Sequence, residues 1–136
     1  MALPFFVTPL YAALCGLLLM VLSARVILLR RALKVGLGDG DQPVLRRAIR
    51  VQANCAEYVP LALILLLLLE ISHQVPVVAL HVLGLLLLVG RIAHALGVSR
   101  SGGTGLGRII GIGGTFSMMI VAAVWLLVIA LAALRV

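Results

Sequence analysis

Acidic side chains are scarce in this chain, which has four Asp and Glu residues against eleven Lys and Arg residues and a net charge of +7. Such a positive balance indicates nucleic-acid binding when it lies on a polar surface together with aromatic side chains. Here aromatic residues make up 4% of the chain and charged residues 11%, too few to form that surface. The charge instead predicts membrane topology and, in part, an anion-binding site.

Cysteine is also rare, and neither of the two cysteines indicates a disulfide framework or a metal pair. Cys15 and Cys55 both lie inside apolar segments, where a thiol behaves as a small buried side chain. Asp39 and Asp41 occur in the glycine-rich segment 36–43, but this segment lacks the other ligands and the closing glutamate of a calcium-binding EF-hand. We therefore expect a turn at 36–43 and no metal site.

Long apolar runs dominate the chain, of which 64% is hydrophobic. A helix needs roughly 20 apolar residues to cross a bilayer, and four segments are long enough. No basic segment precedes the first of them, so we expect no cleavable signal peptide. The sequence predicts a single all-α integral membrane domain over residues 1–136, a four-transmembrane-helix bundle with spans at about 7–29, 46–70, 75–96 and 108–134.

Glycine is concentrated between the third and fourth spans, from Gly97 to Gly107, and we expect a loop there. Gly107 and Gly111 have the spacing that allows two membrane helices to approach closely. A glycine-rich helix start explains the same pair equally well.

The basic residues are unevenly distributed along the chain. Ten of the eleven lie in or beside the first and third connections between the apolar segments, and only Arg135 lies on the other side. Connections rich in Lys and Arg stay in the cytoplasm. We therefore expect these two connections to be cytoplasmic and both termini to lie on the opposite side of the membrane.

A polar stripe interrupts the start of the second apolar segment. It consists of Arg50, Asn54, Glu57 and Tyr58. Their spacing of i, i+4, i+7 and i+8 places them on one face of a helix. An ionisable side chain in a membrane helix costs roughly 2.5–3.5 kcal/mol on insertion scales, so this stripe indicates a polar site buried between helices.

Two simpler interpretations of these residues remain open. Arg46 and Arg47, and also Arg50, could be cations at the membrane edge that reach the lipid headgroups. A pairing of Arg50 with Glu57 could also serve only to join helices.

A second polar pair ends the third apolar segment, where Arg91 and His94 share a helix face at i and i+3. The predicted topology brings this pair to the same membrane face as the stripe. Guanidinium groups bind carboxylates through paired hydrogen bonds, and a carboxylate such as that of Glu57 can bind an ammonium group. The implied ligand is a small anion with several carboxylates and an amine, bound from the cytoplasm beside an apolar groove for a lipophilic second substrate.

The segment Arg50–Pro60 (RVQANCAEYVP) closely resembles the second-helix signature of the MAPEG family, membrane-associated proteins in eicosanoid and glutathione metabolism that include microsomal glutathione transferases. Arg30 and Arg31 resemble paired arginines at the end of the family's first helix, and the segment Arg91–His94 resembles its third-helix Arg-x-x-His. The resemblance covers nearly the whole chain, although the last segment matches only in hydropathy. The sequence most resembles the short bacterial members of the family, which implies that the protein lies in a bacterial inner membrane.

The resemblance implies a homotrimer that holds glutathione between neighbouring subunits near the cytoplasmic face. The residues that would hold the peptide are Arg50, Asn54, Glu57 and Tyr58, with Gln52 as a weaker candidate. Those that would line the same site are Arg30, Arg91 and His94. Arg108 would stabilise the glutathione thiolate, with Arg31 as a second arginine near the sulfur and Arg100 as a rival for the role of Arg108.

The same resemblance implies a transferase that conjugates the glutathione thiolate to lipophilic electrophiles, with reduction of lipid hydroperoxides as a variant on the same site. Val98 and Ile109 stand where the family's eicosanoid enzymes carry tyrosine and serine, which argues against a specific eicosanoid substrate. Two other classes stay open. One is a non-catalytic protein that binds glutathione or lipid, and the other is a small transporter or proton relay that uses Glu57.

The predicted topology can be tested by labelling. Single cysteines placed in the connections at 36–43 and 99–105 should react with a membrane-impermeant maleimide only from the cytoplasmic side, because the flanking Lys and Arg residues anchor there. The measurement compares intact cells with inverted vesicles. Labelling of these loops from outside intact cells would reverse the orientation.

Overall fold

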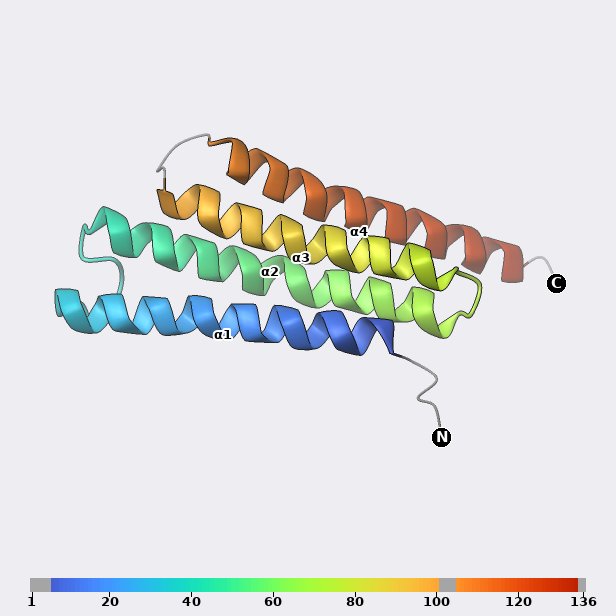
Figure 1. Ribbon diagram of the computed structural model, residues 1–136, viewed down its shortest axis with the longest axis horizontal. Helices are drawn as coiled ribbons and strands as arrows, with labels where there is room; N and C mark the ends of the chain where they lie inside the picture. The colour runs from blue at the N-terminus through green and yellow to red at the C-terminus, as the bar shows by residue number, and fades with distance from the viewer. Residues whose placement is uncertain (1–5, 101–104, 135–136) are drawn as a thin grey trace.

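The computed structural model describes residues 6–100 and 105–134, and in that part of the chain every regular element is a helix. The elements are α1 (Val7–Leu33), α2 (Pro43–Ile71), α3 (Val77–Arg100) and α4 (Leu106–Ala133). They lie lengthwise beside one another, with successive helices running in opposite directions (Figure 1). Each is long and apolar enough to cross a membrane, which confirms the predicted all-α fold with four candidate spans. Arg135 lies outside the described residues.

The loop between α1 and α2 forms where the turn was predicted, and side chains from both helices form hydrogen bonds to it. α1 ends at Leu33, and the next residue, Lys34, adopts a left-handed conformation with φ 56°. Arg30 donates a hydrogen bond of 2.8 Å to the carbonyl oxygen of Gly38, and Arg46 at the start of α2 forms an ion pair with Asp39. The hydrogen bond from Arg46 lowers the pKa of the Asp39 carboxyl below its ordinary value, so this pair remains charged well into the acid range.

The start of α1 is held by a carboxylate from the far end of α2. α1 has no capping side chain of its own. Glu70 supplies the acceptors: its Oε1 atom accepts hydrogen bonds from the backbone N–H groups of Phe6 (2.9 Å) and Val7 (2.8 Å), and its Oε2 atom accepts one from Thr8 (2.7 Å). These are donors that a helix leaves unpaired at its N-terminus, where the helix dipole also favours negative charge. The sequence indicated no role for Glu70 beyond its place at the end of the second predicted span, 46–70.

Glycines bring α3 and α4 into close contact. A Cβ atom at Gly111 would lie 2.5 Å from the backbone nitrogen of His94, and a Cβ atom at Gly97 would lie 2.5 Å from that of Arg108. Gly107 likewise lies against Gly97, so close packing is the correct explanation of Gly107 and Gly111. The expected loop was wrong for residues 97–100, which continue α3, and for residues 106 and 107, which begin α4, because Gly97 and Gly107 are packing positions here and do not break the helices. Residues 101–104 of that loop lie outside the described part of the chain.

The four helices are not equally enclosed. In their most apolar stretches, 33% of α2 and 39% of α3 are buried, but only 11% of α1 and 11% of α4. The outward face of α4 carries a shallow apolar hollow, lined by Ile120, Val121, Val124, Trp125 and Val128. α2 and α3 therefore form the interior of the bundle, whereas α1 and α4 present broad apolar faces to lipid or to protein.

Substitution of Glu70 tests the cap on α1. Glu70→Ala leaves three backbone N–H groups without their acceptor, and a hydrogen bond to a charged group contributes about 1.5–3 kcal/mol. We expect the free energy of unfolding to fall by at least about 3 kcal/mol, and Glu70→Gln to lose less because one acceptor oxygen remains. Detergent-induced unfolding followed by circular dichroism measures both.

Gln74→Ala is the control, since it removes an exposed polar side chain from the loop that follows α2 at the same end of the bundle. Exposed substitutions usually change the free energy of unfolding by no more than about 0.5 kcal/mol. Equal effects of Gln74→Ala and Glu70→Ala would show that the cap contributes nothing of its own.

Candidate functional site

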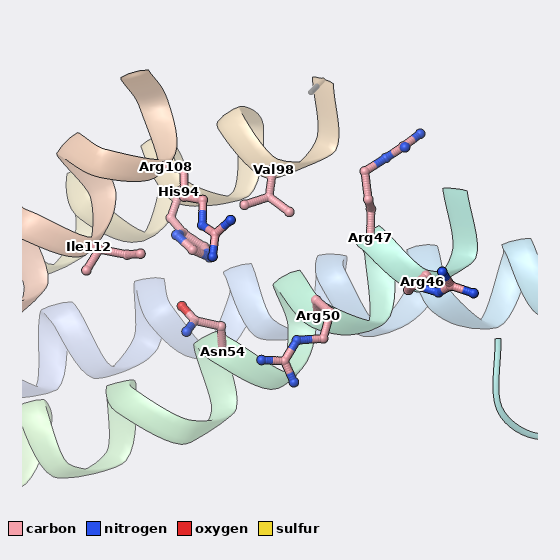
Figure 2. A pocket seen from close by; sticks show the side chains of 8 residues that line it. All are labelled: Arg46, Arg47, Arg50, Asn54, His94, Val98, Arg108 and Ile112. Atoms are coloured by element: carbon pink, nitrogen blue, oxygen red, sulfur yellow. The ribbon is translucent and has the colours of Figure 1, made fainter. Parts of the chain in front are cut away.

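A cavity of about 300 Å³ lies between α2, α3 and α4, toward the end of the bundle that carries the α1–α2 and α3–α4 connections. Eight residues line it: Arg46, Arg47, Arg50, Asn54, His94, Val98, Arg108 and Ile112 (Figure 2). Four of them are arginines, and the lining contains no carboxylate. The cavity is therefore strongly electropositive.

Helical periodicity brings these side chains together. The spacing of four residues keeps side chains on one helix face, and it recurs on each wall: positions 46, 50 and 54 of α2, 94 and 98 of α3, and 108 and 112 of α4. In Figure 2, His94 and Arg108 lie together on one side, and Arg50 and Asn54 lie on the other. The close contact at Gly111 allows α4 to present Arg108 beside His94.

Several polar atoms of this cavity have no partner within the described chain. The Nε atom of Arg47 and the Nδ1 atom of His94 are buried and make no hydrogen bond, although His94 is only 6% exposed. Among the described residues, ion pairs form only at Arg46, so Arg50 and Arg108 have no carboxylate partner. A buried unpaired polar group costs about 1–3 kcal/mol. An anion with several acceptor oxygens would satisfy these groups.

Arg91 lies one turn deeper along α3 than His94 and is not part of the cavity lining. Its side chain is 3% exposed. Its Nη1 atom donates to Oδ1 of Asn54 (2.6 Å), Nε donates to Oγ1 of Thr115 (2.8 Å), and Nη2 donates to the carbonyl oxygen of Gly111 (3.1 Å). Its Cζ atom also lies 5.9 Å from the ring centroid of Tyr58. Arg91 was expected to line the site, but its guanidinium instead joins α2, α3 and α4 next to the cavity.

The structure divides the predicted stripe on α2. Arg50 and Asn54 line the cavity, but Gln52, Glu57 and Tyr58 do not. Glu57 is exposed, and the Tyr58 ring packs against Phe116 of α4 with ring centroids 5.3 Å apart. Glu57, the one carboxylate of the stripe, therefore lies outside this cavity.

The three arginines predicted near the glutathione sulfur lie at different places. Arg108 lines the cavity. Arg31 lies with Arg30 beside a separate hollow at the end of α1, and Arg100 is exposed at the end of α3. In the described chain, Arg108 alone of the three is in a position to act on a ligand in this cavity.

The sequence left open whether Arg47 is a cation at the membrane edge or part of the anion site. Its Nε atom is buried without a hydrogen bond, and the residue lines the cavity. Thr115, in contrast, was not predicted to belong to a site. Thr115 lies in a segment without charges, and its hydroxyl accepts from Arg91 and donates to the carbonyl oxygen of Gly111 (3.1 Å). Thr115 follows Gly111 by four residues and so shares its helix face. This spacing was the one signal in the sequence that could have placed Thr115 at the contact between α3 and α4.

Comparisons with known proteins find relatives of this chain. The model of the MAPEG family matches residues 8–132, from the first turn of α1 to the last turn of α4. Inner membrane protein YecN of Escherichia coli strain K12 is 41% identical over 91 residues, which is 67% of this chain and 69% of that protein. The protein of the same name from an Escherichia coli O6:H1 strain gives the same values.

The close contact at Gly111 should be sensitive to a single added methyl group. Gly111→Ala places a Cβ atom 2.5 Å from the backbone of His94, and overpacking of this kind costs about 1–3 kcal/mol. Gly113→Ala is the control, because its Cβ atom meets nothing within 4 Å. We expect only Gly111→Ala to lower the free energy of unfolding, measured by detergent-induced unfolding, whereas two stable variants would contradict the described packing of α3 on α4.

Proposed function

Because this chain belongs to the MAPEG family, we propose that it is a glutathione-dependent membrane transferase that conjugates the glutathione thiolate to lipophilic electrophiles. The observation that carries this proposal is the arginine-lined cavity with buried, unpaired polar atoms at Arg47 and His94. Glutathione has two carboxylates, one ammonium group and one thiol. Its carboxylates match the unpaired guanidinium groups, which bind carboxylates in a bidentate manner.

Arg50 and Asn54 are the residues that we propose to hold the peptide, because both line the cavity on the α2 side. His94 faces them from α3 (Figure 2). Arg108 is the residue proposed beside the sulfur, since it lines the cavity at the start of α4 and has no carboxylate partner among the described residues. The apolar wall at Val98 and Ile112 would receive the lipophilic second substrate.

We propose that the active assembly is a homotrimer with the site completed across subunits. Support comes from the exposed apolar faces of α1 and α4, each only 11% buried in its most apolar stretch. Support also comes from Glu57, a carboxylate suited to the ligand's ammonium group that lies outside the cavity of its own subunit. In a trimer, Glu57, Gln52, Arg30 and Arg31 would reach a ligand bound at a neighbouring subunit.

The chemistry requires a thiolate at neutral pH. A free thiol has a pKa of about 8.5, and an adjacent cation lowers it. Arg108 would supply that cation and remain protonated throughout. The thiolate would attack an electrophilic carbon, so that a sulfur–carbon bond forms while the leaving group departs with its electron pair. With a lipid hydroperoxide, the thiolate would attack the terminal peroxide oxygen, so that a sulfur–oxygen bond forms as the O–O bond breaks, and the alkoxide would take a proton and leave as the alcohol. The thiol of a second glutathione would then attack the sulfur of the resulting sulfenic acid, which forms glutathione disulfide and releases water.

The pH dependence of conjugation tests the role of Arg108. Removing the cation in Arg108→Ala should raise the pKa of the bound thiol, because desolvation then favours the neutral form without compensation. Turnover at pH 7 should fall about tenfold for each unit of that rise and recover partly at higher pH. Glutathione affinity should fall much less, because Arg50 and Asn54 remain. The measurements are the pH profile of conjugation with a chlorinated nitroaromatic substrate and calorimetric binding of glutathione.

Arg31→Ala and Arg100→Ala serve as matched comparisons, since they remove the same group from the two rival positions. A shifted profile in one of them, with an unchanged profile in Arg108→Ala, would assign the thiolate to that arginine. Binding of glutathione by wild-type protein without thiolate absorbance or turnover would favour the non-catalytic binding class. Absence of glutathione binding would refute the proposed function.

A further inference from the structure

Asn54 is held in one orientation by Arg91. An arginine side chain has five N–H donors and no acceptor, whereas an asparagine amide has one acceptor oxygen and one donor NH₂ group. The 2.6 Å contact with Nη1 of Arg91 therefore requires that Oδ1, and not Nδ2, faces Arg91. This assignment follows from the chemistry of the pair.

The orientation leaves the donor end of Asn54 available. Within the described residues, Nδ2 of Asn54 has no hydrogen-bond partner, and it is not among the buried unpaired side-chain atoms. It is therefore accessible, and Asn54 lines the cavity together with Arg50 and Arg108. The polar groups on this part of the lining are then all donors.

Arg91 itself cannot turn away to release the amide oxygen. Its other two contacts, to Thr115 (2.8 Å) and to the carbonyl oxygen of Gly111 (3.1 Å), fix the plane of the guanidinium. No described carboxylate pairs with it, so these neutral acceptors are what stabilise its charge inside the bundle. Moving Arg91 from Asn54 would leave a buried charge with one acceptor fewer, which is costly.

We propose that Arg91 is a positioning residue that makes Asn54 a hydrogen-bond donor to the ligand, so that the cavity takes an acceptor group of glutathione, a carboxylate or the thiolate, at this point and excludes its ammonium group. This inference rests on the proposed function and adds the orientation of the peptide. The acceptor end of the ligand lies against Asn54, and the ammonium group lies outside the cavity.

Asn54→Asp is the decisive variant. The aspartate retains an oxygen for Arg91 and adds an ion pair, so the thermal stability of the protein should be unchanged or higher. The same change replaces the donor by a second acceptor with negative charge. The affinity for glutathione, measured by calorimetry on the full chain in detergent, should therefore fall about 100-fold or more. If Asn54 instead accepted a hydrogen bond from the ammonium group, Asn54→Asp would bind glutathione as well as wild type or more tightly, and the inference would be wrong.

A double-mutant cycle tests the action of Arg91 through Asn54. Asn54→Ala should weaken binding by about tenfold in wild-type protein but by much less in Arg91→Met, where the amide is free to rotate. Equal losses in both backgrounds would overturn the positioning role. Glu70→Gln is the control for a purely structural effect: it weakens the cap on α1, away from the cavity lining, so it should lower stability while affinity stays within about threefold. The Asn54→Asp result decides the inference even if Arg91→Met does not fold.

The outcomes separate the inference from the proposed function. If wild-type protein binds glutathione and Asn54→Asp binds it equally, the inference alone fails. If wild-type protein binds no glutathione, the proposed function fails and the inference falls with it.

Discussion

The bundle depends on how one buried charge, the guanidinium of Arg91, is satisfied. Hydrocarbon offers no water to an unpaired polar group, so every such group must find its partners within the protein. Arg91 finds them on two other helices, at Asn54 of α2 and at Thr115 and Gly111 of α4. The carbonyl oxygen of Gly111 is within reach only because α3 and α4 are so close, with a Cβ atom at Gly90 only 3.1 Å from that oxygen. The buried charge of Arg91 therefore depends on the glycine contacts, because only they bring its acceptor on α4 close enough.

Polar residues in this bundle are of two kinds, and the number of their partners distinguishes them. Glu70 and Arg91 are almost fully buried, yet each makes three hydrogen bonds within the chain. Arg47 and His94 contain buried atoms that make none. The first kind stabilises the fold. The second kind costs stability in a membrane domain. Of the three such side-chain atoms among the described residues, Oγ1 of Thr8 lies at the start of α1, and the other two belong to residues that line the cavity, which is the physical reason to expect a ligand there.

Much of the fold could be predicted from the sequence, because each membrane span needs about 20 apolar residues and that signal is strong. Helical spacing also brought Arg50 and Asn54 to one surface correctly. The role of Glu70 could not be predicted, since its partners are backbone groups 62–64 residues away that have no side-chain signature. Arg91 and His94 share a helix face and are both buried, and only the packing of α4 decides that His94 lines the cavity whereas Arg91 is held by Thr115 and Gly111. The place of Glu57 in the site stays a prediction, because it requires a neighbouring subunit.

The hollow on the outward face of α4 has a spectroscopic consequence. Trp125 is the only tryptophan of the chain, and it lines that hollow together with aliphatic side chains. Indole emission excited at the red edge therefore arises from a single position, on a helix face that is separate from the arginine-lined cavity. The wavelength of that emission responds to whether the face meets hydrocarbon, water or another protein surface. The chain thus carries its own fluorophore for following what covers α4, without any attached dye.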